Sequence, residues 1–294
     1  MSGEVLKKRI LALNGVFAVN KPTGESSARV VEKVKNSLID VIKGDRHLPH
    51  REFSALRRSL KVGHGGTLDP LATGVLVIGL GSGCKRLQQF LTDVKKGYRA
   101  VGRFGEAYDT FDCTGKVTKS KPFDHILEQD IQKVLQERFT GTIMQVPPIF
   151  SALRINGERA YSIARKRQQQ AQSPAAEEAN HKKAKPEDSN VPPDEQLAGP
   201  VEAEVGEEIK MTPRKVTIDR IKLLRWEKPE FEIEMECGSG TYVRSVFHDL
   251  GEMLDSAAAM FALVRTKQGS FCLEDCLSVD DLTDLEKIEK AICK

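Results

Sequence analysis

The sequence predicts an α+β fold, with helices and strands interspersed along a chain of 294 residues. Two observations support this class. Apolar residues occur in three patterns: continuous runs typical of buried strands, alternation typical of half-exposed strands, and a spacing of three or four typical of amphipathic helices. The connections between these stretches are long. This mixture favours an α+β sheet architecture over an all-α or all-β one.

The N-terminal part is expected to contain a short buried strand and then a helix. The strand covers residues 14–20 (NGVFAVN) and ends at the turn of residues 21–24. Ser26 or Ser27 can cap the following helix, because a serine hydroxyl accepts hydrogen bonds from the first backbone amides. Apolar residues then recur on one face as far as Ile42, so the helix is expected to end near Lys43.

A glycine-rich loop is expected in the next segment. Residues 44–60 are polar, basic and irregular, and residues 61–74 (KVGHGGTLDPLATG) form the loop, which leads into the continuous apolar strand of residues 75–80. The turn at residues 81–83 then starts a helix. Its buried side is expected to carry Leu87, Phe90 and Leu91.

The remaining regular elements follow from alternation and helical spacing. The sequence predicts strands at residues 98–104, 215–224 and 231–237, and helices at residues 128–139 and 243–254. Residues 272–294 are too few for a further domain of about 50 residues, so a short C-terminal tail is expected there.

Composition excludes several classes of protein. No apolar run reaches the roughly 20 residues that a membrane-spanning helix needs. The six cysteines include no CxxC pair, and the six histidines include no HExxH motif, so neither a disulfide scaffold nor a metal site is expected. No secretory signal is expected at the N-terminus, which leaves the nucleus, the cytoplasm and the mitochondrion open.

The net charge of +3 hides an asymmetry. Residues 1–100 hold eighteen Lys or Arg and eight Asp or Glu, a balance of +10, which indicates an anionic partner such as nucleic acid. A solvated basic surface without a partner is the alternative.

Residues 168–208 hold three basic and ten acidic residues, five prolines and no aromatic residue. Such a segment buries too little apolar surface to become ordered, so a disordered insertion is predicted.

Asp69 is the residue with the most unusual local sequence. Pro70 favours an extended backbone before it, and the glycines of the loop allow close approach of a ligand. A carboxylate presented on such a rigid loop suits a nucleophile or a general base. The alternative is an aspartate that caps a turn through its own backbone.

The segment of residues 63–87, GHGGTLDPLATGVLVIGLGSGCKRL, resembles the signature of the TruB family of pseudouridine synthases. Further segments resemble other family elements, in the family's order: VNKPTGESS (19–27), KGYRA (96–100), GRFGEAYDTFDCTG (102–115), QVPPIFSALRINGERAY (145–161), CGSGTYVR (237–244) and LVRTKQGSF (263–271). Together they cover most of residues 14–271, and the GHGG form is similar to that of eukaryotic stand-alone members. Some residues depart from the family pattern: Ser26, Phe150, Arg154 and Val264.

The resemblance implies a pseudouridine synthase fold, with a mixed and mainly antiparallel sheet flanked by helices and loops. The catalytic domain is then residues 14–271, interrupted by the insertion at 168–208 and followed by the tail at 272–294. The implied activity is isomerisation of uridine to pseudouridine at position 55 in the T-loop of tRNA, with no cofactor. The implied substrate is the T-stem-loop, or another RNA with a similar loop.

The resemblance also implies roles for individual residues. Asp69 matches the catalytic aspartate, and Arg244 matches the arginine that pairs with it. Tyr98 matches the tyrosine that stacks on the flipped uracil. Tyr242 and Leu263 match residues that line the uridine pocket, and His64 matches a histidine that contacts RNA. Lys21 is the weakest of the implied substrate-binding residues, and its implied role is to support the residues that touch the substrate. Without the resemblance, Tyr98 is better explained as a core aromatic and Arg244 as a solvated surface arginine.

The implied mechanism is base flipping, in which the target uridine leaves its stack and enters the pocket. The basic N-terminal third and residues 154–167 then hold the RNA backbone. Val264 weakens any phosphate contact inferred at its position. Two other functions stay open. One is a guide-RNA-dependent synthase subunit, which would require a further RNA-binding domain, and the other is a non-catalytic tRNA chaperone. We expect a monomer with no obligate protein partner.

Overall fold

The computed structural model describes residues 3–44, 49–151, 153–155, 158–160, 163 and 211–292. They form two compact units, which are residues 1–145 with 214–294 and residues 146–213. The smaller unit contains a two-stranded hairpin of β8 (Arg154–Ile155) and β9 (Glu158–Arg159). The predicted insertion at 168–208 lies outside the described residues.

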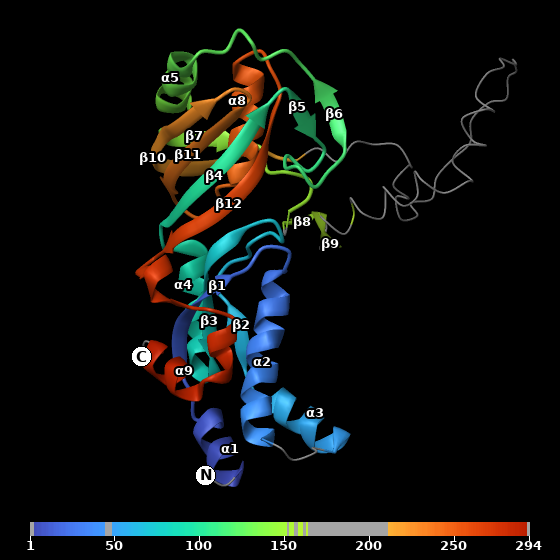
Figure 1. Ribbon diagram of the computed structural model, residues 1–294, viewed down its shortest axis with the longest axis vertical. Coiled ribbons are helices and arrows are strands. Elements are labelled where there is room, and N and C mark those ends of the chain that lie inside the picture. Colours follow the sequence, from blue (N-terminus) through green and yellow to red (C-terminus); the bar gives the residue numbers. More distant parts are fainter. Residues whose placement is uncertain are drawn as a thin grey trace, which may run out of the picture. The chain divides into compact units, whose positions relative to one another are not determined.

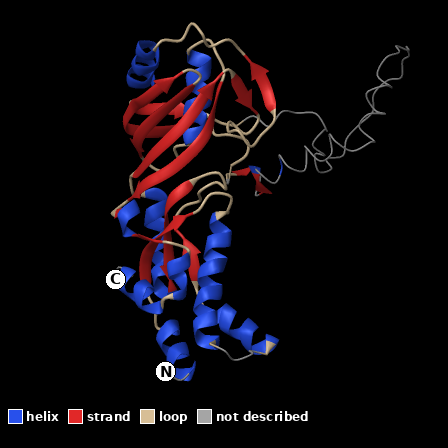
Figure 2. Ribbon diagram, in the orientation of Figure 1, coloured by secondary structure: helices blue, strands red, loops and turns tan. Residues whose placement is uncertain are grey.

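The larger unit is organised around a ten-stranded sheet (Figures 1 and 2). The main path through it has the order β14-β1-β3-β12-β4-β11-β10-β7, and β2 and β13 add to β3 and β12. Pairing is antiparallel except at β1–β14 and β3–β12. The strands are β1 (Gly15–Lys21), β2 (Val62–His64), β3 (Thr73–Leu80), β4 (Lys96–Phe104), β7 (Gly141–Gln145), β10 (Arg214–Glu227), β11 (Glu230–Cys237), β12 (Ala258–Gln268), β13 (Phe271–Cys272) and β14 (Cys276–Leu277). A mixed, mainly antiparallel sheet is therefore confirmed.

Helices and a small hairpin complete this unit. Helix α2 packs against β2, whereas α5 and α8 pack on the β10 and β12 part of the sheet (Figure 1). The hairpin consists of β5 and β6. These elements are α1 (Gly3–Leu11), α2 (Ser27–Lys43), α3 (His50–Ser59), η1 (Gly81–Arg86), α4 (Leu87–Thr92), β5 (Glu106–Tyr108), β6 (Val117–Ser120), α5 (Glu128–Phe139), α8 (Val243–Met253), η2 (Leu273–Asp275), η3 (Asp280–Thr283) and α9 (Leu285–Ala291).

The predicted patterns match the observed burial. Strand β3 is a continuous apolar run because it is covered on both faces: Leu76 and Ile78 belong to the main core, and Val75 and Val77 to a smaller cluster. Strand β11 alternates instead, with Phe231 and every second residue after it buried and the intervening glutamates more exposed. Ser26 caps α2 as expected, because its hydroxyl accepts from the Arg29 amide.

Glycine is required where β3 meets β12. Gly74 has φ +101° and lies opposite Arg265 in the parallel pair. An added Cβ would come within 2.3 Å of the Arg265 carbonyl oxygen. The close approach of the two backbones therefore depends on the missing side chain.

Two predictions of local structure are wrong. Residues 44–60 are not irregular throughout, because His50–Ser59 form α3, and its Phe53 and Leu56 pack into the core with Leu60. The few apolar residues of α3 stand among several basic ones, so the local sequence does not indicate a helix. Packing against α2 stabilises the helix instead. Leu91 is not on the buried side of α4, since 43% of it is exposed.

Both ends of the larger unit are part of its core. Before residue 14, Ile10 of α1 is 1% exposed. After Phe271, β14 pairs with β1, and Leu282 and Ile288 are fully buried in the main core. Residues of α1 and the described residues after 271 therefore pack against the same core as residues 14–271. Among the residues that the structure describes, no helix is long and apolar enough to cross a bilayer.

Candidate active site

Asp69 lies on the loop between β2 and β3 and is bound by an arginine from α8. Its Oδ2 is 3.0 Å from Nε of Arg244. The arginine side chain is 7% exposed, whereas that of Asp69 is 36% exposed. The sequence-based pairing of Arg244 with Asp69 is therefore present. The carboxylate is accessible from solvent, while the cation that orients it is buried.

Arg244 is held in place by the turn between β5 and β6. Its Nη1 donates to the Thr110 carbonyl at 2.8 Å, and its Nε lies 3.7 Å from Oδ2 of Asp112, a carboxylate that is 6% exposed. The other oxygen of Asp112 accepts from the backbone amide of Thr114 at 3.0 Å and from the hydroxyls of Thr110 and Thr114. A buried carboxylate thus balances the buried guanidinium, which leaves Arg244 oriented toward Asp69.

The loop around Asp69 has a bonded carbonyl at each of seven successive residues, from 65 to 71. On its N-terminal side, β12 supplies the donors. Gln268 Nε2 donates to the Gly65 carbonyl at 2.6 Å. Arg265 donates to the carbonyls of Gly66 and Thr67 at 3.1 and 3.5 Å, and its Nε donates to Val75 at 2.7 Å.

On the C-terminal side, the segment of residues 21–27 supplies most donors. The Ser27 hydroxyl donates to the Leu68 carbonyl at 3.0 Å and accepts from the Leu68 amide at 2.8 Å. The Asp69 carbonyl accepts from Ala72 within the loop at 3.0 Å. The carbonyls of Pro70 and Leu71 accept from the Gly24 amide at 2.8 Å and the Thr23 hydroxyl at 3.2 Å. The backbone is therefore fixed on both sides of the exposed carboxylate.

Lys21 supports this loop and does not face solvent. It is fully buried, and its Nζ donates to the carbonyls of Pro22 at 2.8 Å, Glu25 at 2.6 Å and Pro70 at 3.4 Å. Burial lowers the pKa of Lys21 to about 8, partly opposed by the negative charges of Glu25 and Asp69. Lys21 therefore binds the backbone beside Asp69, and its role in substrate binding stays a prediction.

Tyr98 lies on β4 opposite Arg265 of β12. Its side chain belongs to the main core and is 7% exposed. Burial raises the pKa of the Tyr98 hydroxyl, and the neighbouring Arg265 guanidinium opposes the rise. Burial also lowers the pKa of Arg265. Tyr98 is thus a core aromatic residue with a small part of its surface exposed. Its stacking on uracil stays a prediction.

The other expected binding residues occupy different places. Tyr242 precedes α8, and its amide and carbonyl bond to the side chain of Gln145 at 2.8 and 3.0 Å. Leu263 is 7% exposed on β12, and its carbonyl accepts from Thr73. His64 ends β2 and lines a cavity between that strand and α2. Their contacts with RNA stay predictions.

Four functional side chains were missed by sequence reasoning: Thr110, Asp112, Arg265 and Gln268. Each lies within a segment that resembles a family element, at residues 102–115 or 263–271. The available signal was therefore the motif itself. In the segment of residues 263–271, Val264 offers no cation for a phosphate contact. The next residue, Arg265, does carry a cation, and its contacts are with carbonyl oxygens of the loop and of β3.

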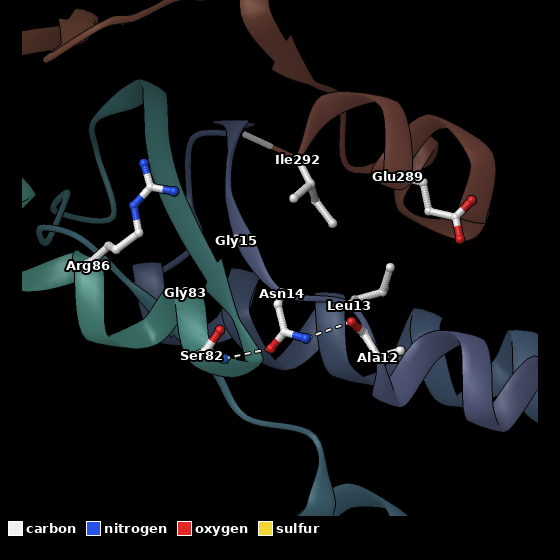
Figure 3. Close-up of a pocket in the computed structure, with 9 residues that line it drawn as sticks. All are labelled: Ala12, Leu13, Asn14, Gly15, Ser82, Gly83, Arg86, Glu289 and Ile292. Atoms are coloured by element: carbon white, nitrogen blue, oxygen red, sulfur yellow. Dashed lines mark hydrogen bonds between the residues drawn. The ribbon is translucent and has the colours of Figure 1, made fainter. Parts of the chain in front are cut away.

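A cavity of about 660 Å³ lies elsewhere in the larger unit (Figure 3). It is lined by the N-terminal end of β1, by η1 and by α9, and the Asn14 side chain joins the Ser82 amide to the Ala12 carbonyl beside it. None of the predicted site residues lines it. Within the described part of the chain, no group of three or more His, Cys, Asp or Glu side chains could hold a metal ion.

Comparison with known proteins decides the family. Residues 53–190 and 200–243 match the model of the TruB family pseudouridylate synthase N-terminal domain. The chain belongs to the TruB family of pseudouridylate synthases. Human pseudouridylate synthase TRUB1 is 36% identical over 294 residues, which are 99% of this chain and 71% of that protein. The tRNA pseudouridine synthase B of Phocaeicola vulgatus is 35% identical over 238 residues, or 80% of this chain and 84% of that protein.

Solved structures agree with the TruB assignment at the level of fold. Cbf5 in a Cbf5-Nop10-Gar1 complex superposes with a TM-score of 0.57 at 23% identity. The match covers 97% of this chain and 57% of the solved chain, so this chain spans little more than half of it. A likeness at this identity concerns the fold alone. The predicted pseudouridine synthase fold is confirmed.

Proposed function

We propose that this TruB-family chain isomerises uridine to pseudouridine in tRNA, with Asp69 as the catalytic carboxylate. One observation carries the proposal: the solvent-accessible carboxylate of Asp69 is bound by buried Arg244 at 3.0 Å, on a loop whose carbonyls from residue 65 to residue 71 all accept hydrogen bonds. Such a carboxylate keeps its position while a nucleotide enters and leaves. Fixed geometry is what a nucleophile or base needs to act on one atom of the sugar.

The reaction breaks the N1–C1′ bond of uridine, turns the base and forms a C5–C1′ bond. C5 loses a proton and N1 gains one, so substrate and product are isomers. Asp69 can attack C1′ or remove the 2′ proton, and either path needs an ionised carboxylate. Arg244 pairs with this carboxylate, with its guanidinium 3.0 Å away, and so fixes the orientation of the reacting oxygens. Asp112 in turn offsets the charge of Arg244, so the guanidinium is not left unpaired in the protein interior.

The proposed substrate is the T-loop of tRNA, at position 55. Relatives named tRNA pseudouridine synthase support tRNA as the RNA class. The target base must leave its stack, at a cost of a few kcal/mol, to reach a carboxylate on a rigid loop. We further propose that the chain acts as a monomer without an obligate partner, in the nucleus, the cytoplasm or the mitochondrion.

The test uses the purified chain and an unmodified tRNA transcript, and maps pseudouridine by chemical labelling and primer extension. We expect one pseudouridine, at position 55, and the same product from the isolated T-arm stem-loop. A transcript with cytidine at position 55 is the matched control and should give none. A bare transcript that stays unconverted, or converts only when a guide RNA is added, would contradict the proposal.

A further inference from the structure

Phe111 has a backbone conformation that a bulky side chain rarely adopts. It lies between Thr110, whose carbonyl accepts from Arg244, and Asp112, whose carboxylate lies beside the same guanidinium. Its φ is +63°, in the left-handed region that favours glycine. A strained residue of this kind persists only where its surroundings hold it, and such residues cluster at functional sites.

Two elements hold Phe111. Strand β12 holds the backbone: the Met260 amide donates to the Phe111 carbonyl at 3.2 Å, and the Met260 carbonyl accepts from the Cys113 amide at 3.0 Å. Helix α8 holds the side chain, because the imidazole of His248 lies parallel to the Phe111 ring, with 3.9 Å between the ring centroids and 8° between the planes. The turn is thus fixed from both the strand and the helix.

His248 follows Arg244 by four residues on α8, so the two side chains lie on the same face of the helix. Arg244 bonds to the carbonyl before Phe111, and His248 stacks on the ring of Phe111 itself. The Nδ1 atom of His248 is buried and has no hydrogen-bond partner among the described residues. The contact that the structure gives His248 therefore uses the face of its ring rather than its nitrogens.

The surroundings of His248 favour the neutral form of its ring. Burial lowers the pKa of His248, and the nearby Lys119 adds to this effect, whereas Glu252 opposes it. A neutral imidazole can stack on Phe111 without placing a second cation beside Arg244.

We propose that the Phe111–His248 stack is a positioning device, which fixes the turn of residues 110–112 and thereby holds the Arg244 guanidinium against Asp69. This inference rests on the proposed function of Asp69. Neither ring touches the substrate in this scheme. Loss of the stack should let the turn relax from its strained conformation and Arg244 move away from Asp69. The expected loss is in kcat, since the RNA-binding surface is unchanged.

The experiment compares His248→Ala, which removes the ring, with His248→Phe, which keeps a flat ring for stacking. We expect kcat on the tRNA transcript to fall at least tenfold in His248→Ala, with KM within twofold, and to recover to within threefold in His248→Phe. His50→Ala, in an exposed histidine of α3, is the matched control. All assays are run well below the lowest melting temperature of the set.

A second readout does not depend on catalysis. Solvent exchange of the Arg244 Nε proton, followed by NMR, should be at least tenfold faster in His248→Ala than in the wild type and near wild type in His248→Phe. If the wild type makes no pseudouridine, the proposed function fails, and the exchange rates alone support or overturn the positioning role. The positioning role would be overturned if His248→Ala kept a kcat within twofold of wild type together with an unchanged exchange rate. It would also be overturned if His248→Ala changed only KM.

Discussion

Two of the regions in which arginines meet carboxylates differ in burial. Beside Asp69, the side chains of Arg244 and Asp112 are 7% and 6% exposed. On the polar face of β4 and β11, Arg99 pairs with Glu232 at 3.0 Å and Arg103 with Glu230 at 3.2 Å, but both arginines are about half exposed. Both regions pair a guanidinium with carboxylates, and they differ strongly in access to water.

Burial decides what each pair can do. Exposed pairs are screened by water and ions, and they contribute at most about 1 kcal/mol. A buried pair is costly to assemble, and removal of one partner leaves an unpaired charge in the interior. Arg244 and Asp112 therefore give the site a fixed geometry, whereas the arginines of β4 contribute mainly to the solubility of a sheet face.

The largest effect is expected from Arg244→Met. This change leaves Asp112 as an unpaired buried carboxylate and releases Asp69, so unfolding free energy should fall by about 3–5 kcal/mol and activity should be nearly lost. Urea unfolding and tRNA conversion measure the two losses. Normal activity with normal unfolding would show that Arg244 has no such role.

Lys21→Met should have the next largest effect. Carbonyls beside Asp69 lose a charged donor, which typically costs about 2–3 kcal/mol, and the loop loses part of its support. Activity should fall together with stability. Lys133→Met, in an exposed lysine of α5, is the control and should leave both unchanged. Equal unfolding curves for the two variants would contradict the role of Lys21 in the loop.

The pH dependence of the unfolding free energy should distinguish buried lysines from exposed ones. Lys96 on β4 is buried and bonds to the Ser239 hydroxyl at 2.7 Å, and burial lowers its pKa to about 8. The ordinary pKa of a lysine is 10.5. Between pH 8 and pH 10.5, the unfolded chain therefore binds more protons at Lys96 than the folded chain does, so the contribution of Lys96 to stability rises with pH. The difference in unfolding free energy between wild type and Lys96→Met should therefore grow, by on the order of 1 kcal/mol. A difference that stays flat or shrinks would contradict this.

The smallest effect is expected from Arg99→Met on the exposed face. Its pair with Glu232 is half exposed, so the change should cost less than about 0.5 kcal/mol and leave tRNA conversion unaltered. The residual difference should vanish at 1 M salt. A loss as large as that of Arg244→Met would remove the distinction between the two regions.

Sequence patterns located Asp69 better than they located the residues that support its loop. Asp69 stands out because Pro70 and the glycines make its surroundings unusual, and the apolar run of β3 is visible as a strand. The supports of the loop are not visible in this way, because a buried arginine such as Arg265 looks like a surface arginine until the packing is known. Helix α3 was missed for a related reason: contact with α2, rather than local composition, stabilises it.

The most direct measurement is the single-turnover rate of Asp69→Asn on the tRNA transcript, with binding measured in parallel. The change keeps the size of the side chain and removes its charge, while the bonded carbonyls of the loop remain. We expect pseudouridine formation to be abolished and tRNA affinity to stay within a few-fold of wild type. A rate above a tenth of wild type would contradict a catalytic role of Asp69, and lost affinity would indicate a structural role instead.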